Sequence, residues 1–318
     1  MFHTIATFRS RSSRCFVAAC ALGAALLMVR PAAAQTFSTV LSSNLFQPTA
    51  VAVSPLNRYI ISDTANNRIV EFNPDSSAFV VLAGSEEAGA RDGIGSEAAF
   101  RSPQGLVTVP EGIIVADTGN NLIRLVTYQG AVVTIAGDLA LAHEADELAG
   151  NPQNGGLVNG PALSARFRNP SALAADGRRI YIADSGNRAI RLLDLDTGLV
   201  STLVASGLVQ PTGLAAGQNG DLYISDAGTH SIKRLRGGQL QLVAGRDNVF
   251  DSGLRNGASA NALFRSPRSI YYREAKDELV VVDSGNALLR VIQNVSSPDA
   301  RVDTVANSGT AGYLSPVG

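Results

Sequence analysis

The sequence has no tryptophan, two cysteines and three histidines in 318 residues. Cys15 and Cys20 both precede residue 35, so a chain that loses residues 1–34 has no cysteine and cannot form a disulfide. That shorter chain keeps two histidines, His143 and His230, in separate predicted loops, whereas zinc normally takes three or four protein ligands. Charged residues make up 17% and hydrophobic residues 45%, as in a globular protein with a large core.

Acidic residues are absent from positions 1–34, and the remaining features of that stretch are those of a secretory signal peptide. Arginines occur in residues 1–14, residues 15–29 are apolar, and Pro31-Ala32-Ala33-Ala34 offers a cleavage site after Ala34. An apolar run of this length is shorter than the roughly 20 residues that span a bilayer. We expect a secreted protein, extracellular or periplasmic, that begins at Gln35.

The charge balance argues against a nucleic-acid partner. Residues 1–34 contain four arginines of the chain's 26 basic residues and none of its 27 acidic residues, which leaves 22 against 27 and a net charge of about −5. Nucleic-acid-binding domains usually carry a basic face. No segment after residue 34 approaches membrane-spanning length, so we expect no membrane span either.

One sequence pattern occurs five times. It consists of an apolar run, a turn that begins with Asp, and a second apolar run. Residues 113–126, IIVADTGNNLIRLV, are the clearest copy, and the others begin at Ile60, Ile180, Leu222 and Leu279. The turn residues Gly and Asn accept positive φ, and Asp can bond to its own backbone, so each copy predicts a β-hairpin. Repetition at this period is typical of an array of structural repeats.

Each copy lies in a longer unit that predicts four short strands. A proline precedes each Asp by 15, 14, 14, 15 and 16 residues, and each unit ends in a strand such as FVVLAG at 79–84 or VVTIAG at 132–137. Four-stranded antiparallel units repeated around an axis are the blades of a β-propeller. The fold class is therefore all-β, and solenoid arrays, the competing type, have shorter or helical repeats.

The units resemble NHL repeats, a family of six-bladed propellers. The resemblance lies in the Pro-x-Gly start, the Asp-Thr-Gly-Asn-Asn-x-Ile-Arg centre, the Ala-Gly end, and linkers such as RDGIGSEAAFRSP at 91–103. It covers residues 37–318 of a domain at 35–318 and implies a fold rather than a function. The repeats lie at about 46–100, 101–167, 168–208, 209–264 and 265–318.

The number of blades is open at this point. Residues 313–318 align with Phe100–Gly105, the start of a blade, and the predicted strand at 37–42 resembles a fourth strand. We expect a six-bladed design whose last blade is mostly missing, with a native five-bladed ring as the alternative.

The recurring charged residues are interpreted as structural. The turn aspartates recur in every unit, where a carboxylate that accepts turn amides explains them without a function. They are Asp63, Asp117, Asp184, Asp226 and Asp283. A cation follows four of them by seven residues, with Val70 in the first unit, and we expect it to pack between blades against a carboxylate. These cations are Arg124, Arg191, Lys233 and Arg290.

The fourth position after each Asp varies, so the repeat itself does not demand a particular residue there. The strand order places the Asp turns on the same face of the propeller as the long connections 85–102, 138–169 and 246–266, and loops on a rigid scaffold often bind ligands. The candidate ligand-binding residues are Asn67, Asn121, Arg188 and His230, with Ala287 in the last unit. A solvated turn is the alternative interpretation.

Two hypotheses of function follow. The first is a non-catalytic binding module for a protein, peptide or glycan, without a cofactor, a metal ligand set or a catalytic residue. The second is a metal-dependent hydrolase or lyase with its site at the channel mouth, where Asp, Asn and Glu could hold calcium. The sequence has no Gly-x-Ser-x-Gly motif, and His143 stands in a charged run, His-Glu-Ala-Asp-Glu, that is typical of a solvated loop.

Overall fold

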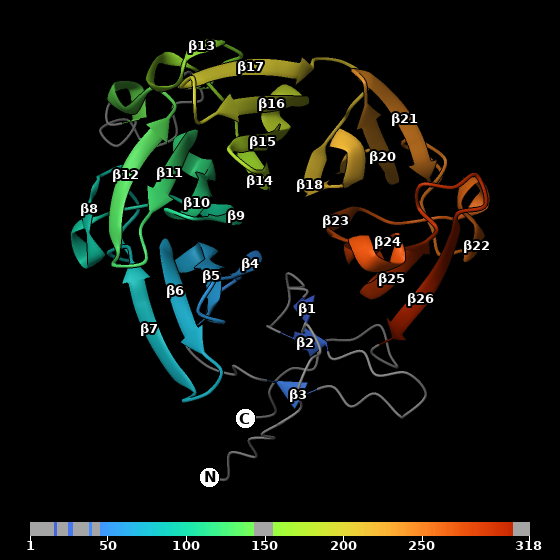
Figure 1. The fold of residues 1–318 in the computed structure, drawn as a ribbon, viewed down its shortest axis with the longest axis horizontal. Coiled ribbons are helices and arrows are strands. Elements are labelled where there is room, and N and C mark those ends of the chain that lie inside the picture. Colours follow the sequence, from blue (N-terminus) through green and yellow to red (C-terminus); the bar gives the residue numbers. More distant parts are fainter. Residues whose placement is uncertain (1–15, 18–24, 28–37, 40–44, 143–154, 308–318) are drawn as a thin grey trace.

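The chain folds into a ring of β-sheets around a central axis (Figure 1). The computed structural model describes residues 16–17, 25–27, 38–39, 45–142 and 155–307. Five antiparallel sheets radiate from the axis as the blades of a β-propeller, which confirms the all-β prediction. Within these ranges no helix has the length and apolar character needed to cross a bilayer.

Every blade contains four strands that pair in sequence order, with the first strand nearest the axis (Figure 1). Blade one consists of β4 (Ala50–Val53), β5 (Tyr59–Asp63), β6 (Arg68–Asn73) and β7 (Ala78–Ala83). Blade two consists of β9 (Pro103–Val109), β10 (Gly112–Asp117), β11 (Leu122–Val126) and β12 (Ala131–Ala136). Blade three consists of β14 (Pro170–Asp176), β15 (Arg179–Asp184), β16 (Ala189–Asp194) and β17 (Leu199–Val204). Blade four consists of β18 (Pro211–Ala216), β19 (Leu222–Asp226), β20 (Ser231–Arg236) and β21 (Gln239–Ala244), and blade five of β23 (Pro267–Arg273), β24 (Glu278–Asp283), β25 (Leu288–Gln293) and β26 (Arg301–Asn307).

Three blades also carry a two-residue strand at the outer edge, which the repeat pattern does not predict. These strands are β8 (Gly93–Ile94), β13 (Gly160–Pro161) and β22 (Gly257–Ala258), and each pairs with the fourth strand of its blade. All three come from the long linkers before blades two, three and five. The linkers are therefore part of the blades rather than free connections.

The strand sequences follow from the position of each strand in its blade. All six residues of β10 are buried, because neighbouring blades cover both faces of the second strand. A strand in this environment reads as a continuous apolar run. The outer strand β7 has only one buried residue, Ala83, and it exposes Val80 and Val81 to solvent.

Hydrophobic clusters join the blades in pairs. One cluster joins Ile60 of blade one to Val115 of blade two, and similar clusters join blades two to three, three to four and four to five. The linker phenylalanines Phe100, Phe167 and Phe264 are fully buried in three of these clusters. Among the described residues, no cluster joins blade five to blade one.

A hydroxyl group bonds to the next blade at four junctions. At three of these junctions the residue after the turn Asp donates to the carbonyl of the proline that begins the following blade. These bonds run from Thr64 to Pro103 (2.7 Å), from Thr118 to Pro170 (2.7 Å) and from Ser185 to Pro211 (2.5 Å). Blade four has Ala227 at this position, and Thr212 donates to the Pro267 carbonyl instead (3.0 Å). Within the described chain, the equivalent hydroxyl of blade five, Ser284 Oγ, is buried and has no hydrogen-bond partner.

Two segments outside the repeat pattern are the insert 138–169 and the predicted strand at 37–42. The insert 138–169 is helical over residues 139–142, and residues 143–154 lie outside the described part. The predicted strand at 37–42 was expected to be the fourth strand of a blade. Its described residues form β3 (Ser38–Thr39), which instead pairs with β2 (Ala25–Leu27). β2 also pairs with β1 (Phe16–Val17), and both strands lie within the predicted signal peptide, which stays a prediction.

We predict that two identical substitutions will have different effects on stability. Ser185 and Ser284 occupy the same place in identical Asp-Ser-Gly-Asn turns, but only Ser185 bonds to a following blade. Ser185→Ala should lower the free energy of unfolding by about 1 kcal/mol, because it removes the short bond to the Pro211 carbonyl and leaves only Ser171 Oγ, at 3.4 Å, as a donor. Ser284→Ala should be neutral or stabilising, since it removes a buried hydroxyl without a partner. Urea denaturation of both variants measures the difference, and equal losses would show that Ser284 does have a partner.

Candidate functional site

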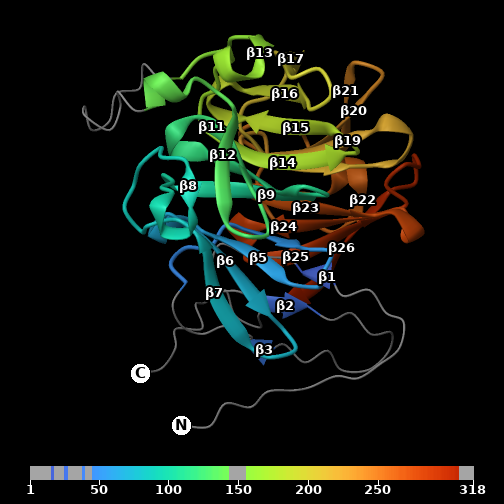
Figure 2. The ribbon, with the colours of Figure 1, turned by 60° about the vertical axis from the view of Figure 1, so that its left-hand side comes forward.

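The Asp turns and the blade-to-blade linkers lie at the same end of the propeller, as the strand order predicts. In blades two, three and five, the turn asparagine donates from Nδ2 to a linker carbonyl. These bonds run from Asn120 to Gly89 (2.7 Å), from Asn187 to Gly156 (2.7 Å) and from Asn286 to Gly253 (2.8 Å). We call this end of the molecule the loop-rich face. The hairpins between the first and second strands lie at the opposite end (Figure 2).

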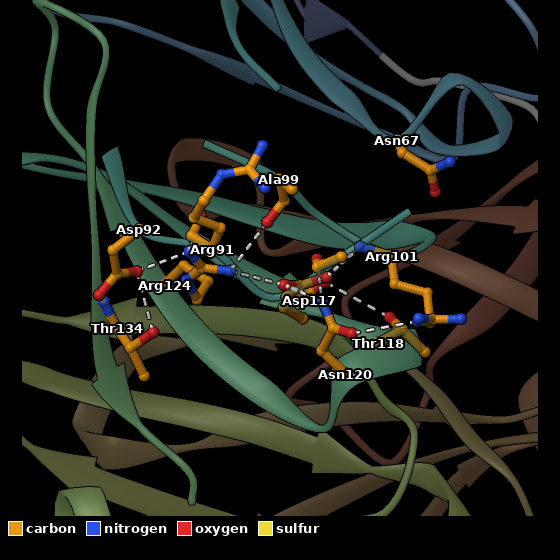
Figure 3. A network of polar contacts seen from close by, with 12 residues as sticks. Asn67, Arg91, Asp92, Ala99, Arg101, Asp117, Thr118, Asn120, Arg124 and Thr134 are labelled. Atoms are coloured by element: carbon orange, nitrogen blue, oxygen red, sulfur yellow. Dashed lines mark hydrogen bonds and ion pairs between the residues drawn. The ribbon is translucent and has the colours of Figure 1, made fainter. Parts of the chain in front are cut away.

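A buried carboxylate at the centre of each turn holds the loop-rich face together, as blade two illustrates (Figure 3). Asp117 is fully buried, and its Oδ1 accepts a hydrogen bond from the backbone N–H of Arg101 (2.8 Å). Its Oδ2 accepts from Asn120 Nδ2 (2.8 Å) and from Arg124 Nη1 (2.9 Å). One carboxylate therefore fixes the linker, the turn and the third strand of its blade.

Arg124 extends this network to the linker and the outer strand (Figure 3). Its side chain is fully buried, with Nη2 donating to the Arg91 carbonyl (2.9 Å) and to Asp92 Oδ1 (2.6 Å). The guanidinium carbon lies 5.2 Å from the centre of the Phe100 ring, which adds a cation–π contact. Asp92 in turn accepts from the backbone and hydroxyl of Thr134 in β12.

The same arrangement occurs in blades three and five. Asp184 pairs with Arg191 (2.9 Å) and Asp283 with Arg290 (2.8 Å), with Asn159 and Asn256 in the place of the linker Asp92. The predicted cation is therefore buried against a carboxylate, and that carboxylate belongs to its own blade. The bonds to the Asp come from the linker backbone and the Asn side chain, whereas the sequence predicted amides of the turn itself.

Blades one and four keep the ion pair with different cations. In blade one, Val70 occupies the usual arginine position, and Arg68 donates from Nε to Asp63 Oδ2 (2.8 Å). In blade four, which follows a short linker, Lys233 Nζ lies 3.0 Å from Asp226 Oδ2 and 2.7 Å from Asp247 Oδ1. The ammonium group also donates to the Gly207 carbonyl (2.7 Å).

Burial dominates the electrostatics of these carboxylates. It raises the pKa of Asp117 to about 6, although Arg124, Asn120 and the Arg101 amide act in the opposite direction. Burial likewise raises the pKa of Asp184 and of Asp283, and each again has an Asn, an Arg and a backbone amide that oppose the shift. These groups have all their partners within the protein, which favours the structural interpretation of the five aspartates.

Three of the four candidate ligand-binding residues bond to the next blade. Asn67 Oδ1 accepts from the Ser102 N–H (2.9 Å), Asn121 Oδ1 from the Asn169 N–H (2.7 Å) and His230 Nδ1 from the Ser266 N–H (3.1 Å). Their φ angles of 51°, 57° and 55° lie in the left-handed region, which Asn adopts more readily than most residues. A role of these residues in ligand binding stays a prediction.

Arg188, the fourth candidate, has the same left-handed backbone but an exposed side chain. Its guanidinium group cannot accept a hydrogen bond from the next blade. There the Gln210 N–H bonds instead to Asp226 Oδ1 of its own blade (2.7 Å). Arg188 is therefore the one candidate whose side chain is directed to solvent rather than used at a blade junction.

The inner strands enclose a central cavity of about 170 Å³. The residue after each blade's first proline lines it, and these five residues are Thr49, Gln104, Ser171, Thr212 and Arg268. Tyr271 and small or apolar residues form the rest of the wall, and Arg268 is its one charged residue. The carboxylates expected for a calcium centre on the axis are not among the lining residues, and in the described ranges no three His, Cys, Asp or Glu are grouped as metal ligands.

The repeat analysis missed a set of arginines on the loop-rich face. Arg101, Arg168 and Arg265 each follow the buried linker phenylalanine and precede the first strand of a blade. Each side chain lies over the glycine of the Asp turn in its blade, and a Cβ on Gly119 would come within 2.5 Å of Arg101 Cγ. The turn glycine is therefore needed for this close approach, whereas the sequence analysis assigned it to a positive φ. The recurrence of arginine after the linker phenylalanine could have revealed the set.

We predict a large loss of stability when the buried ion pair is broken. Asp184→Asn removes the charge partner of the fully buried Arg191 and should lower the free energy of unfolding by about 3–5 kcal/mol. Asp196→Asn, in the same blade, removes an exposed partner of Arg178 and should cost less than about 1 kcal/mol. Denaturant melts of the two variants against the parent chain measure both values. Similar small losses in the two variants would contradict the structural role of the turn aspartates.

Comparison with known proteins gives matches to repeat proteins. The NHL repeat model matches residues 208–235. The chain is 26% identical over 292 residues to NHL repeat-containing protein 2 of Bos taurus, covering 81% of this chain and 39% of that protein. It is 26% identical over 285 residues to NHL repeat-containing protein 2 of Homo sapiens, covering 79% and 39%. It is 27% identical over 342 residues to Protein SUPPRESSOR OF QUENCHING 1, chloroplastic, of Arabidopsis thaliana, covering 84% and 32%.

The chain therefore spans less than half the length of these relatives. Among solved structures, a streptogramin B lyase aligns with a TM-score of 0.53 at 12% identity, covering 88% of this chain and 75% of the lyase. A catalytically inactive virginiamycin B lyase from Staphylococcus aureus with quinupristin aligns with a TM-score of 0.51 at 11% identity, covering 88% and 76%. At such identities the likeness concerns the propeller fold alone.

Proposed function

We propose that this chain is an NHL-repeat β-propeller that serves as an exported, non-catalytic module and binds a protein, peptide or glycan on its loop-rich face. The observation that carries the proposal is the fixation of the linkers by the buried Asp–Arg pairs of blades two, three and five. Loops that are ordered before binding lose little conformational entropy on binding, which favours affinity. The turn carboxylates themselves are occupied by structural bonds.

The linker before blade five adds exposed apolar side chains to this rigid face. Phe250 is 89% exposed, and Val249 and Leu254 are also exposed. The loop has a defined shape, because Asn248 Oδ1 accepts from the backbone N–H groups of Phe250 and Asp251. A rigid loop that presents an aromatic side chain to solvent is suited to fill a pocket on a partner.

We predict that binding depends on this face and not on the opposite one. Phe250→Ser combined with Leu254→Ser should abolish saturable binding to hits from a random-peptide array and a glycan array. Leu56→Ser is the matched control, because Leu56 is an exposed apolar residue in the β4–β5 hairpin at the opposite end. Equal losses in both variants, or no hit in either array, would contradict the proposal. A melting temperature that falls by several degrees with EDTA would favour the metal-dependent hydrolase or lyase instead.

Export rests on the leader pattern of residues 1–34. Expression with residues 1–34 present should yield a processed protein outside the cytoplasm, and N-terminal sequencing should read Gln-Thr-Phe-Ser from Gln35. Recovery of an extracellular protein that retains residues 1–34, or retention of the whole protein in the cytoplasm, would contradict this part of the proposal.

We propose also that the junction between blades five and one accepts a sixth blade. The unpartnered Ser284 hydroxyl and Ala287 support this idea, since their equivalents in other blades bond to the backbone of the following blade. In a chain extended by a copy of residues 101–137, Ser284→Ala should become destabilising by about 1 kcal/mol. An unchanged, neutral effect in the extended chain would favour a native five-bladed ring.

A further inference from the structure

Four arginines on the loop-rich face make no ion pair. Arg168, Arg188, Arg265 and Arg268 are exposed, and none of them makes a side-chain hydrogen bond or ion pair in the ranges that the structure describes. They come from blades three and five, which lie on either side of blade four in the ring (Figure 1). Their charges are therefore available to a ligand.

The repeat geometry fixes where these four arginines lie. Arg168 and Arg265 pack over the turn glycines Gly186 and Gly285, because their backbone N–H groups bond to the buried Asp184 and Asp283. Arg188 is the left-handed residue that ends the same turn of blade three, two residues after Gly186. Arg268 is the second residue of β23 and lines the central cavity. The set reaches from the turns to the mouth of the channel.

Among the residues that the structure describes, no acid of the loop-rich face pairs with these arginines. The turn aspartates are buried and paired with other cations. Five of the seven described linker acids are paired as well, in the pairs Glu86–Arg68, Asp92–Arg124, Asp138–Arg166, Asp247–Lys233 and Asp251–Arg246. A positive field at this mouth is thus a local feature of a chain whose formal net charge is −1.

Apolar side chains occupy two of the five equivalent repeat positions, and arginines occupy the other three. Two residues before the first proline of each blade, the chain has Phe46, Arg101, Arg168, Val209 and Arg265. Phe46 is 59% exposed, and Val209 lies over Gly228 as the arginines lie over their turn glycines. Arg101 bonds to Asn120, so its role in the turn is partly structural. A ligand that matches this ring carries both negative charges and apolar groups.

We propose that the exposed arginines of the loop-rich face bind an acidic polypeptide segment that carries both carboxylate and apolar side chains. The inference rests on the proposed function and names the ligand class of its binding face. A guanidinium group can bind a carboxylate through two parallel hydrogen bonds, and exposed, unpaired arginines keep this capacity. A single-stranded nucleic acid would need ring surfaces on which to stack its bases. Phe46 is the one ring among the five equivalent positions.

The test measures binding of a short fluorescein-labelled peptide of Glu, Leu and Ser by fluorescence anisotropy. Arg168→Gln combined with Arg265→Gln should weaken binding by about fivefold for each arginine removed. Arg188→Gln and Arg268→Gln should each weaken it by a similar factor. Arg168→Lys combined with Arg265→Lys should give an intermediate loss, because lysine keeps the charge but not the paired geometry.

Arg179→Gln is the matched control, because Arg179 is an exposed arginine of blade three at the opposite end of β15. It should leave the affinity unchanged, and the same peptide with Gln in place of Glu should not bind. Unchanged melting temperatures in all variants would show that they are folded, as expected for exposed side chains. Equal losses in Arg179→Gln, or tighter binding of a thymidine oligonucleotide than of the acidic peptide, would overturn the inference.

The outcomes separate this inference from the proposed function. Should the acidic peptide fail to bind while array hits still depend on Phe250, the loop-rich face is a binding face for another class of ligand and the arginine inference is wrong. Should the acidic peptide bind while Phe250→Ser has no effect, the arginine inference stands. The proposed contribution of the blade-five linker is then wrong.

Discussion

The buried pair between the turn carboxylate and a cation is the interaction on which the rest of the fold depends. Moving two charges out of water costs several kcal/mol for each, and the pair is stable only where further hydrogen bonds satisfy both groups. Asp117 meets this condition with the Arg101 amide, Asn120 and Arg124, and Arg124 has further acceptors in the linker. The same atoms that stabilise the carboxylate belong to the linker, the turn and the third strand. Satisfying one buried charge therefore fixes three segments at once, and it makes the long linkers a rigid part of the surface.

Fixed turns also set the contacts between blades. In blades one and two, the hydroxyl after the Asp and the left-handed residue that ends the turn both reach the backbone at the start of the next blade, as Thr118 and Asn121 do. In blade three Ser185 makes the first of these bonds, and in blade four His230 makes the second. Because these partners are backbone groups, the bonds survive changes of side chain in the receiving blade. Blade five presents Ser284 and Ala287 at the same two positions and finds no such partner among the described residues. Each of the four junctions thus has at least one side-chain bond to the backbone of the next blade, and in the described ranges neither Ser284 nor Ala287 makes one.

Much of the fold could be predicted from the sequence, because five copies of one sequence pattern reveal the blades, their four strands and the shared end of turns and linkers. The structural role of the aspartates also followed from their recurrence. The variation among Asn67, Asn121 and His230 suggested ligand contacts. Each of these side chains, however, accepts a hydrogen bond from the backbone N–H at the equivalent position of the next blade. A sequence does not show which acceptor positions face a neighbouring blade. Arg168 and Arg265 were missed for the opposite reason. They recur within the linker pattern, which is typical of scaffold residues, and only the structure shows that they pack over Gly186 and Gly285 with their side chains exposed.

Arginine thus has two different roles in these blades, and its position relative to the buried carboxylate separates them. Arg191 donates to Asp184 and to linker carbonyls, and its charge is balanced inside the blade. Arg168 contributes only its backbone N–H to the same carboxylate, so its guanidinium group stays in solvent with its charge unbalanced. A lysine can replace the buried cation, as Lys233 does in blade four, because a point charge is sufficient there. At the surface, planar and paired hydrogen bonding would distinguish arginine from lysine. The buried position that stabilises the blade therefore tolerates either arginine or lysine. At the exposed position, the choice between arginine and lysine matters for recognition.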